Sequence, residues 1–222
     1  MLTALLFDLD GTLTDTDTLH LQAFRKLLFD HDGRELTQEQ FNTQVSGRAN
    51  GPLFAELFPQ ADAASRQVLA ERKEALFREL SPTLASMPGL LRLLDHAERQ
   101  GIGMCVVTNA PRLNAEHMLG AMSLGARFEH VLVADELARP KPDPLPYLTG
   151  LQRLGAKAGQ ALAFEDSLPG VKAAVDAGIF TVGLATTQPA ERLMEAGASL
   201  VIETYDDPRL WDLIERMQRQ CD

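Results

Sequence analysis

The most informative segment of this chain is Leu5-Leu6-Phe7-Asp8-Leu9-Asp10-Gly11-Thr12, a short apolar run that ends in two aspartates and a glycine. The run is typical of a buried strand, because it is too short for a helix before Gly11 interrupts it. Residues two apart on a strand point to the same face, so we expect Asp8 and Asp10 to lie together near its end. Two adjacent carboxylates repel, so one must be protonated, paired or bound to a cation. The simpler alternative is a turn with two solvated aspartates.

The composition is that of an ordinary globular protein, with 45% hydrophobic and 23% charged residues among 222. This length suits one core with a smaller inserted unit. The formal net charge of −10 disfavours nucleic acid and anionic membranes as partners, and no obligate protein partner is evident. The two cysteines, Cys105 and Cys221, provide no disulfide framework, and no signal peptide or long apolar span is found. A cytoplasmic protein is therefore the default expectation.

From about Pro88 onward, short apolar runs alternate with segments of helical periodicity. The expected strands cover residues 104–107, 131–133, 161–164, 180–182 and 200–202, and the expected helices cover residues 90–99, 112–122, 144–154, 168–177, 190–196 and 208–218. This alternation predicts an α/β fold with a doubly wound parallel sheet covered on both faces. An eight-fold barrel would need more strand–helix units.

Residues 15–86 interrupt this alternation with helical stretches and no convincing strand. The expected helices there cover residues 18–29, 37–45, 52–58 and 63–80. We therefore expect a core domain of residues 1–14 and 87–222, with residues 15–86 forming a helical insertion. The expected hinges are residues 13–16 and 84–88.

Side chains that can act as nucleophiles, acids, bases or phosphate and metal ligands follow four of the expected strands. They are Asp8 and Asp10, then Thr108 and Asn109, then Lys141, and finally Glu165 and Asp166. Taken singly, each group has a simpler explanation as a turn residue, a solvated loop lysine or helix N-terminal acids. Ligands of open parallel sheets bind outside the carboxyl ends of the strands, so we expect these groups to meet at one edge.

This set of side chains suits phosphoryl transfer. A carboxylate can attack phosphorus to form an acyl phosphate, and a neighbouring acid can protonate the departing oxygen and then activate water. A lysine with hydroxyl or amide donors can hold the phosphate oxygens. A divalent metal bound by carboxylates can neutralise the remaining negative charge.

Four motifs together resemble those of the haloacid dehalogenase-like superfamily, specifically its phosphatase and phosphomutase branch. They are Phe7-Asp8-Leu9-Asp10-Gly11-Thr12, Val107-Thr108-Asn109, Lys141-Pro142-Asp143 and Glu165-Asp166-Ser167-Leu168-Pro169-Gly170. The resemblance implies a Rossmann-like core, a helical cap inserted after the first strand, and Mg²⁺ as cofactor. The dehalogenases of this superfamily generally lack the second aspartate of the first motif, so Asp10 argues against dehalogenation.

The same resemblance implies roles for individual residues. Asp8 would be the nucleophile and Asp10 the general acid and base. The phosphate would be held by Thr108, Asn109 and Lys141. The metal ligands would be Asp166, the Asp8 carboxylate and the Asp10 backbone carbonyl, with Glu165 as a further candidate.

Three residues of the insertion are candidates for substrate recognition. His20 and Lys73 both lie on apolar helix faces, where a polar side chain either snorkels to solvent or points into a site. Arg48 follows Gly47 in a glycine-containing loop and can reach towards substrate. The alternatives are a rim histidine, a snorkelled lysine and an exposed loop arginine.

These observations favour a Mg²⁺-dependent phosphatase that hydrolyses a small phosphate ester through an aspartyl-phosphate intermediate. The expected substrate is a sugar phosphate or a phosphoglycolate-like acid. The main alternative is a β-phosphoglucomutase-like phosphomutase, a family that is similar in residues 14–16, at His20, in Gly47-Arg48 and near Lys73. Residues 108–112 are more similar to the phosphatases. A phosphonate hydrolase with Lys73 as a Schiff base, or a non-catalytic binding module, is less favoured.

Overall fold

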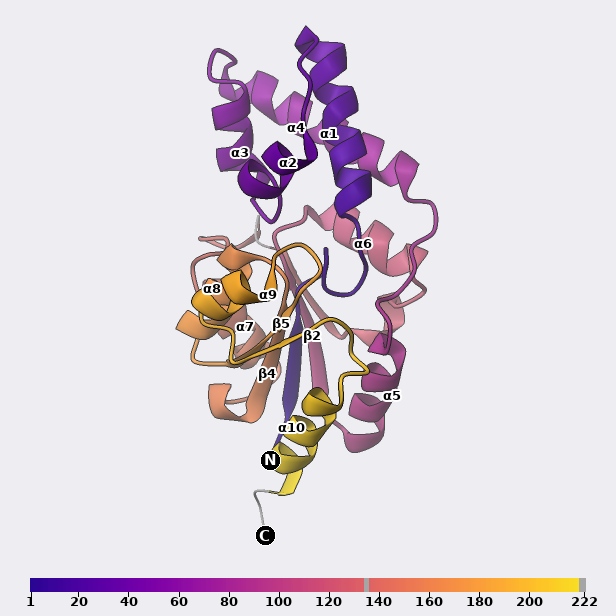
Figure 1. Cartoon of the computed structure of the whole chain (residues 1–222), viewed down its shortest axis with the longest axis vertical. Helices are drawn as coiled ribbons and strands as arrows, with labels where there is room; N and C mark the ends of the chain where they lie inside the picture. The colour runs from indigo at the N-terminus through magenta and orange to yellow at the C-terminus, as the bar shows by residue number, and fades with distance from the viewer. Residues whose placement is uncertain (134–135, 220–222) are drawn as a thin grey trace.

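The computed structural model describes residues 1–133 and 136–219 (Figure 1). Six parallel strands form one sheet in the order β3-β2-β1-β4-β5-β6. They are β1 (Ala4–Phe7), β2 (Gly103–Thr108), β3 (His130–Val133), β4 (Ala161–Glu165), β5 (Phe180–Leu184) and β6 (Leu200–Ile202). The strand order is that of a doubly wound, Rossmann-like sheet, so the predicted α/β fold is confirmed.

Helices cover both faces of this sheet. One face, which includes Phe7 and Phe164, packs against α5 (Leu90–Gln100), α6 (Arg112–Ala121) and α10 (Pro208–Arg219). The other, which includes Leu6, packs against α7 (Leu145–Arg153) and α8 (Leu168–Asp176). Two buried faces explain why β1 reads as an unbroken apolar run. The remaining elements are α9 (Ala190–Glu195) and short 3-10 helices at Gly125–Arg127 and Ala158–Gln160.

The strand register sets the level of the residues that follow each strand. Phe7 of β1 is aligned with Val106 of β2 on one side and with Phe164 of β4 on the other. Asp8 therefore follows β1 at the level where β4 reaches Glu165. The parallel pairing thus brings the ends of β1, β2 and β4 to one edge of the sheet, as the sequence predicts.

Four helices lie between β1 and α5 in the chain: α1 (Asp17–Asp32), α2 (Gln38–Gln44), α3 (Asn50–Leu57) and α4 (Ala63–Leu80). Residues 15–86, all of which are described, contain no strand. The helices share an apolar cluster that includes Phe24, Phe41 and Phe54. They stand beyond the end of the sheet, at the top of Figure 1. The two connecting segments meet there, because the Met87 backbone N–H donates to the Leu13 carbonyl at 2.8 Å.

Local signals in the sequence place the helix ends. Thr37 and Gln40 form a capping box at the start of α2, and the Asp62 side chain caps α4. Gly33 and Gly101 end α1 and α5 in the left-handed conformation, which glycine adopts without strain. All the predicted elements are present, with ends that shift by at most three residues. None of the described helices combines the length and apolar character needed to cross a bilayer, and Cys221 lies outside the described residues.

Candidate active site

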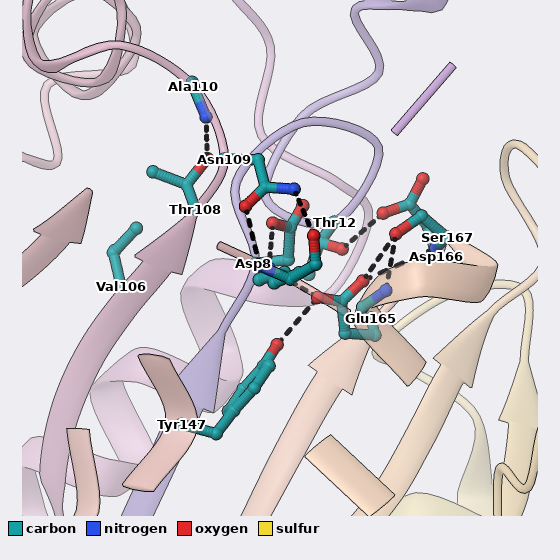
Figure 2. A network of polar contacts seen from close by, with 12 residues as sticks. Asp8, Thr12, Val106, Thr108, Asn109, Ala110, Tyr147, Glu165, Asp166 and Ser167 are labelled. Carbon is teal, nitrogen blue, oxygen red and sulfur yellow. Dashed lines mark hydrogen bonds and ion pairs between the residues drawn. The ribbon is translucent and has the colours of Figure 1, made fainter. Parts of the chain in front are cut away.

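Lys141 connects Asp8, which follows β1, with Glu165, the last residue of β4. Its Nζ atom lies 2.6 Å from Asp8 Oδ1 and 2.5 Å from Glu165 Oε1, and the residue is only 5% exposed. Figure 2 shows Tyr147 of α7 reaching up to Glu165, and its hydroxyl donates to the same Oε1 atom at 2.7 Å. Glu165 Oε2 accepts from the Ser167 hydroxyl at 3.1 Å. Both oxygens of Glu165 are thus used to hold Lys141 and the start of α8.

Asp8, Glu165 and Asp166 form a buried acidic cluster, in which one oxygen of each residue lies within 4.8 Å of the others. Burial raises the pKa of Asp8 to about 8, with Lys141 opposing the shift and Glu165 adding to it. Burial, together with Asp8 and Glu165, also raises the pKa of Asp166 well above its usual range. These shifts mean that Lys141 alone does not neutralise the cluster. A further cation is therefore attracted to this position.

The donor set of this cluster fits a hard divalent cation, which prefers carboxylate and carbonyl oxygens. Asp166 is held by two hydroxyls: Thr12 Oγ1 donates to Oδ1 at 3.0 Å and Thr187 Oγ1 donates to Oδ2 at 2.6 Å. Gly11 packs against the same carboxylate with a φ of 74°, and a side chain there would collide with Asp166. The close approach requires glycine.

The Asp10 carboxylate turns away from this cluster towards α1. Its Oδ1 atom accepts from Thr16 Oγ1 at 2.7 Å and lies 2.8 Å from His20 Nε2. Burial by itself would raise the pKa of Asp10, but His20 and Thr16 outweigh it, so the pKa is lowered. The two aspartates of the first motif therefore lie in different environments and have opposite pKa shifts.

The residues that follow β2 are tied to the segment that carries Lys141. The Lys141 backbone N–H donates to Asn109 Oδ1 at 3.3 Å, and Asn109 Nδ2 donates to the Lys141 carbonyl at 3.5 Å. Thr108 is 1% exposed, and its hydroxyl oxygen accepts from the Ala110 N–H at 2.9 Å. The Thr108 hydroxyl donates to no side chain or carbonyl in the part of the chain that the structure describes, so its proton is available to a ligand oxygen.

His20 and Lys73 meet between α1 and α4. Lys73 Nζ lies 3.3 Å from His20 Nδ1 and 2.7 Å from Glu74 Oε1. The His20 ring stacks on Phe77 with centroids 4.0 Å apart. Lys73 is 3% exposed, so the snorkelled-lysine alternative is wrong. The buried ammonium is instead balanced by Glu74, as buried charges generally are.

Glu74 also links α4 to the sheet-bound helix α6. Its side chain accepts from Asn50 Nδ2 at 2.7 Å and from the Asn114 amide of α6. The Asn114 side-chain oxygen in turn accepts from Arg78, one turn further along α4. Asn114 is 1% exposed. A single amide of α6 therefore contacts two charged residues of the inserted helices.

Arg48 follows Gly47, whose φ is 74° and whose added side chain would come within 2.8 Å of Ser167. The loop thus packs closely against the start of α8. The Arg48 guanidinium forms a two-pronged pair with Glu56 of α3, with N–O distances of 2.6 and 2.9 Å. It is therefore bonded to an acid of the inserted helices in this structure.

A cleft of about 90 Å³ between the sheet edge and the inserted helices collects these side chains. Its walls include all the predicted site residues except Glu165, namely Asp8, Asp10, His20, Arg48, Lys73, Thr108, Asn109, Lys141 and Asp166. Glu165 is 0% exposed and lies behind the others. The predicted convergence is thus present, and the candidates of the insertion reach the same cleft.

The sequence reasoning did not identify several residues that shape the site. Tyr147 and Thr187 hold Glu165 and Asp166 from distant segments, and nothing in their local sequence indicates it. Asn114 lies in a segment of ordinary helical periodicity, which gives no sign of its contacts with Glu74 and Arg78. Glu74 had a partial signal, because an acid four residues before Arg78 is a helical pairing pattern, whereas in the structure both residues bond to Asn114.

Comparison with known proteins places the chain in a family. The sequence profile of the haloacid dehalogenase-like hydrolases matches residues 5–184. The plasmid protein CbbY of Cupriavidus necator is 35% identical over 227 residues, which cover 92% of this chain and 86% of that protein. A phosphorylated carbohydrates phosphatase of Thermotoga maritima is 30% identical over 207 residues, covering 90% and 94%. The chain therefore belongs to the haloacid dehalogenase-like hydrolases.

A solved structure agrees with this assignment. A point mutant of CbbY from Rhodobacter sphaeroides, in complex with xylulose-(1,5)bisphosphate, aligns with a TM-score of 0.84 and 25% identity, covering 93% of this chain and 96% of that one. The resemblance found from the four motifs is thus confirmed. The predicted enzyme class, a phosphoric monoester hydrolase of this family, is confirmed as well.

Proposed function

We propose that this protein is a Mg²⁺-dependent phosphatase that hydrolyses a small phosphorylated metabolite through an aspartyl-phosphate intermediate at Asp8. One observation carries the proposal. Lys141 holds Asp8 at the floor of the cleft beside Asp166, while Asp10 is held separately by His20. This arrangement supports the roles of nucleophile for Asp8, phosphate-binding cation for Lys141 and acid–base group for Asp10.

In the first step, the Asp8 carboxylate attacks phosphorus and the leaving alcohol takes a proton from Asp10. In the second step, Asp10 removes a proton from water, which attacks the phosphoryl group and releases Asp8. The lowered pKa keeps the Asp10 carboxyl group ionised, which is the state that the base step needs. The acid step needs the protonated form of Asp10, and the proton taken from water in the second step restores that form. Lys141 and the Thr108 hydroxyl hold the phosphate oxygens, with Asn109 keeping the Lys141 segment in place.

Mg²⁺ would be held by the carboxylates of Asp8 and Asp166 and by the Asp10 backbone carbonyl, and it would neutralise charge between these acids and the phosphate. Among the predicted ligands, we assign Glu165 a different part. Its oxygens accept from Lys141, Tyr147 and Ser167. We propose that it positions Lys141 rather than binding the metal.

We further propose that residues 15–86 act as a cap domain on the core of residues 1–14 and 87–222. Their separate apolar cluster and the meeting of the two connecting segments support this division. His20, Lys73 and Arg48 would contribute to substrate selection, because all three line the cleft from this side.

The experiment that tests the proposal is a screen of phosphate esters with Mg²⁺, in which release of inorganic phosphate is measured. It includes β-glucose 1-phosphate together with glucose 1,6-bisphosphate. Free phosphate supports the phosphatase, whereas isomerised sugar phosphate supports the phosphomutase alternative, which the similarity at His20, Gly47-Arg48 and Lys73 favours. If no ester is hydrolysed or isomerised, the result would support the alternative that the protein is a non-catalytic binding module.

The phosphonate hydrolase alternative needs Lys73 as a neutral amine. The ion pair with Glu74 stabilises the charged ammonium instead. Borohydride trapping with a candidate aldehyde tests this directly, and an adduct at Lys73 would support the alternative. We expect no adduct.

A further inference from the structure

The walls of the cleft that come from the inserted helices are largely apolar. Phe24 of α1, Phe41 of α2, Val45 after it and Leu53 of α3 line this part, and each is at most 4% exposed. A group of the substrate placed here leaves water and faces mostly hydrocarbon. An apolar surface gains free energy in that position, whereas an unpartnered charge loses it.

The cations that line the cleft are already paired with acids. Among the described residues of its walls, Lys141 pairs with Asp8 and Glu165, Lys73 with Glu74, and Arg48 with Glu56. The fourth basic residue, His20, contacts Asp10. A second anionic group of the substrate would therefore have to displace a carboxylate in order to find a positive partner.

Two of the lining acids, Asp17 and Asp166, form no ion pair among the described residues, and Asp17 is the one that comes from the inserted helices. Its carboxylate accepts one long hydrogen bond, from Ser46 Oγ at 3.4 Å. A carboxylate is an acceptor only, so it can take a further hydrogen bond from a hydroxyl or amine. It repels a second phosphate or carboxylate of the substrate.

We propose that the substrate is a monophosphate ester of an uncharged alcohol, with an apolar face towards Phe41 and Leu53, a hydroxyl or amine donor towards Asp17, and no second phosphate or carboxylate. This assignment rests on the proposed phosphatase activity and narrows its substrate class. It selects sugar monophosphates over sugar bisphosphates, and it selects against phosphoglycolate-like acids.

If a bisphosphate is a good substrate after all, Arg48 is the residue expected to bind its second phosphate. Its pair with Glu56 is partly exposed, with 30% and 65% of the side chains accessible, and exposed pairs contribute little. A bisphosphate could recruit this guanidinium by displacing Glu56. In that case Arg48→Ala would lower kcat/KM for the bisphosphate more than for the matched monophosphate.

The test uses two matched pairs of esters, which differ in one anionic group. The first pair is 2-hydroxyethyl phosphate and phosphoglycolate, and the second is fructose 1-phosphate and fructose 1,6-bisphosphate. We expect kcat/KM, measured by release of phosphate with Mg²⁺, to be at least about tenfold higher for the uncharged member of each pair, because like charges repel strongly in a partly desolvated cleft. Equal or faster turnover of the anionic members would overturn the proposal.

Two variants locate the source of the discrimination. Asp17→Asn keeps the size of the side chain and removes its charge, so the ratio of kcat/KM within each pair should fall several-fold towards unity. Glu35→Gln likewise removes a carboxylate charge, at an exposed position outside the cleft, and should leave the ratio as it is. If Asp17→Asn leaves the ratio unchanged, the proposal that Asp17 repels a second anionic group of the substrate is contradicted. If no ester is hydrolysed, including 4-nitrophenyl phosphate, the proposed phosphatase activity is contradicted, and the substrate class inferred from it is contradicted as well.

Discussion

His20 Nε2 lies 2.8 Å from Asp10 Oδ1, so a helix of the inserted unit directly contacts a carboxylate of the strand-end motif. The ring of His20 is in turn fixed between Phe77, on which it stacks, and Lys73. The protonation state of Asp10 therefore depends on where α1 and α4 lie. Any movement of these helices relative to the sheet would change the contact between His20 and Asp10.

The first prediction concerns Asp10. Asp10→Asn removes the group that exchanges a proton, and kcat for an ester with a poor leaving group should fall by roughly two to four orders of magnitude. The fold should persist, because Asn can still accept from Thr16. Circular dichroism and steady-state kinetics check both points. An unchanged kcat would remove Asp10 from the acid–base role.

The second prediction concerns the metal. Saturating Mg²⁺ should raise the melting temperature by several degrees, because a ligand at about 100 times its Kd stabilises by about 2.7 kcal/mol. Asp166→Asn should abolish this shift and the activity together. Asp176→Asn, an exposed change in the helix that follows, should retain both. A full Mg²⁺ shift in Asp166→Asn would contradict the proposed ligand set.

The third prediction concerns the link between α6 and α4. Asn114→Ala removes one buried hydrogen-bond partner from Glu74 and one from Arg78, and the free energy of unfolding should fall by about 1–3 kcal/mol. Leu113→Ala, at an exposed position of the same helix, should change it by no more than about 0.5 kcal/mol. Urea denaturation measures both. Equal effects of the two substitutions would show that the Asn114 contacts are unimportant in solution.

The fourth prediction is a pH dependence of selectivity. Burial raises the pKa of Asp17 to about 6, with His20 opposing the shift and Asp15 and Asp10 adding to it. Asp17 is therefore neutral below about pH 6 and charged above it, so repulsion of a second anion should weaken as the pH falls through 6. The observable is the ratio of kcat/KM for 2-hydroxyethyl phosphate and phosphoglycolate, in which the titration of the shared phosphate cancels. The ratio should decline below pH 6, and it should be flat in Asp17→Asn.

Most of the fold could be predicted because the pattern of apolar residues along the sequence differs between the buried strands and the helices that cover them. The buried strands read as unbroken apolar runs, and glycines such as Gly101 mark helix ends. The site at the sheet edge could be predicted from topology, since parallel strands end together, Asp8 and Lys141 follow strands, and Glu165 is the last residue of one.

The partners of these residues could not be predicted in the same way. Tyr147 reaches Glu165 across the sheet face from α7, and Asn114 meets Glu74 across 40 residues of sequence. Such contacts depend on how helices pack in three dimensions, and no local pattern encodes them. The same holds for Lys73, whose apolar helix face is compatible with either snorkelling or burial.

The central claim is that the phosphoryl group is transferred to Asp8. The most direct test mixes Asp10→Asn enzyme with Mg²⁺ and 4-nitrophenyl phosphate, whose good leaving group needs little acid help, so that the intermediate accumulates when its hydrolysis lacks a base. Acid quenching, borohydride reduction and peptide mass spectrometry should then find homoserine in place of Asp8. Phosphoryl transfer to another side chain, or rapid turnover with Asp8 unmodified at every time point, would contradict the account.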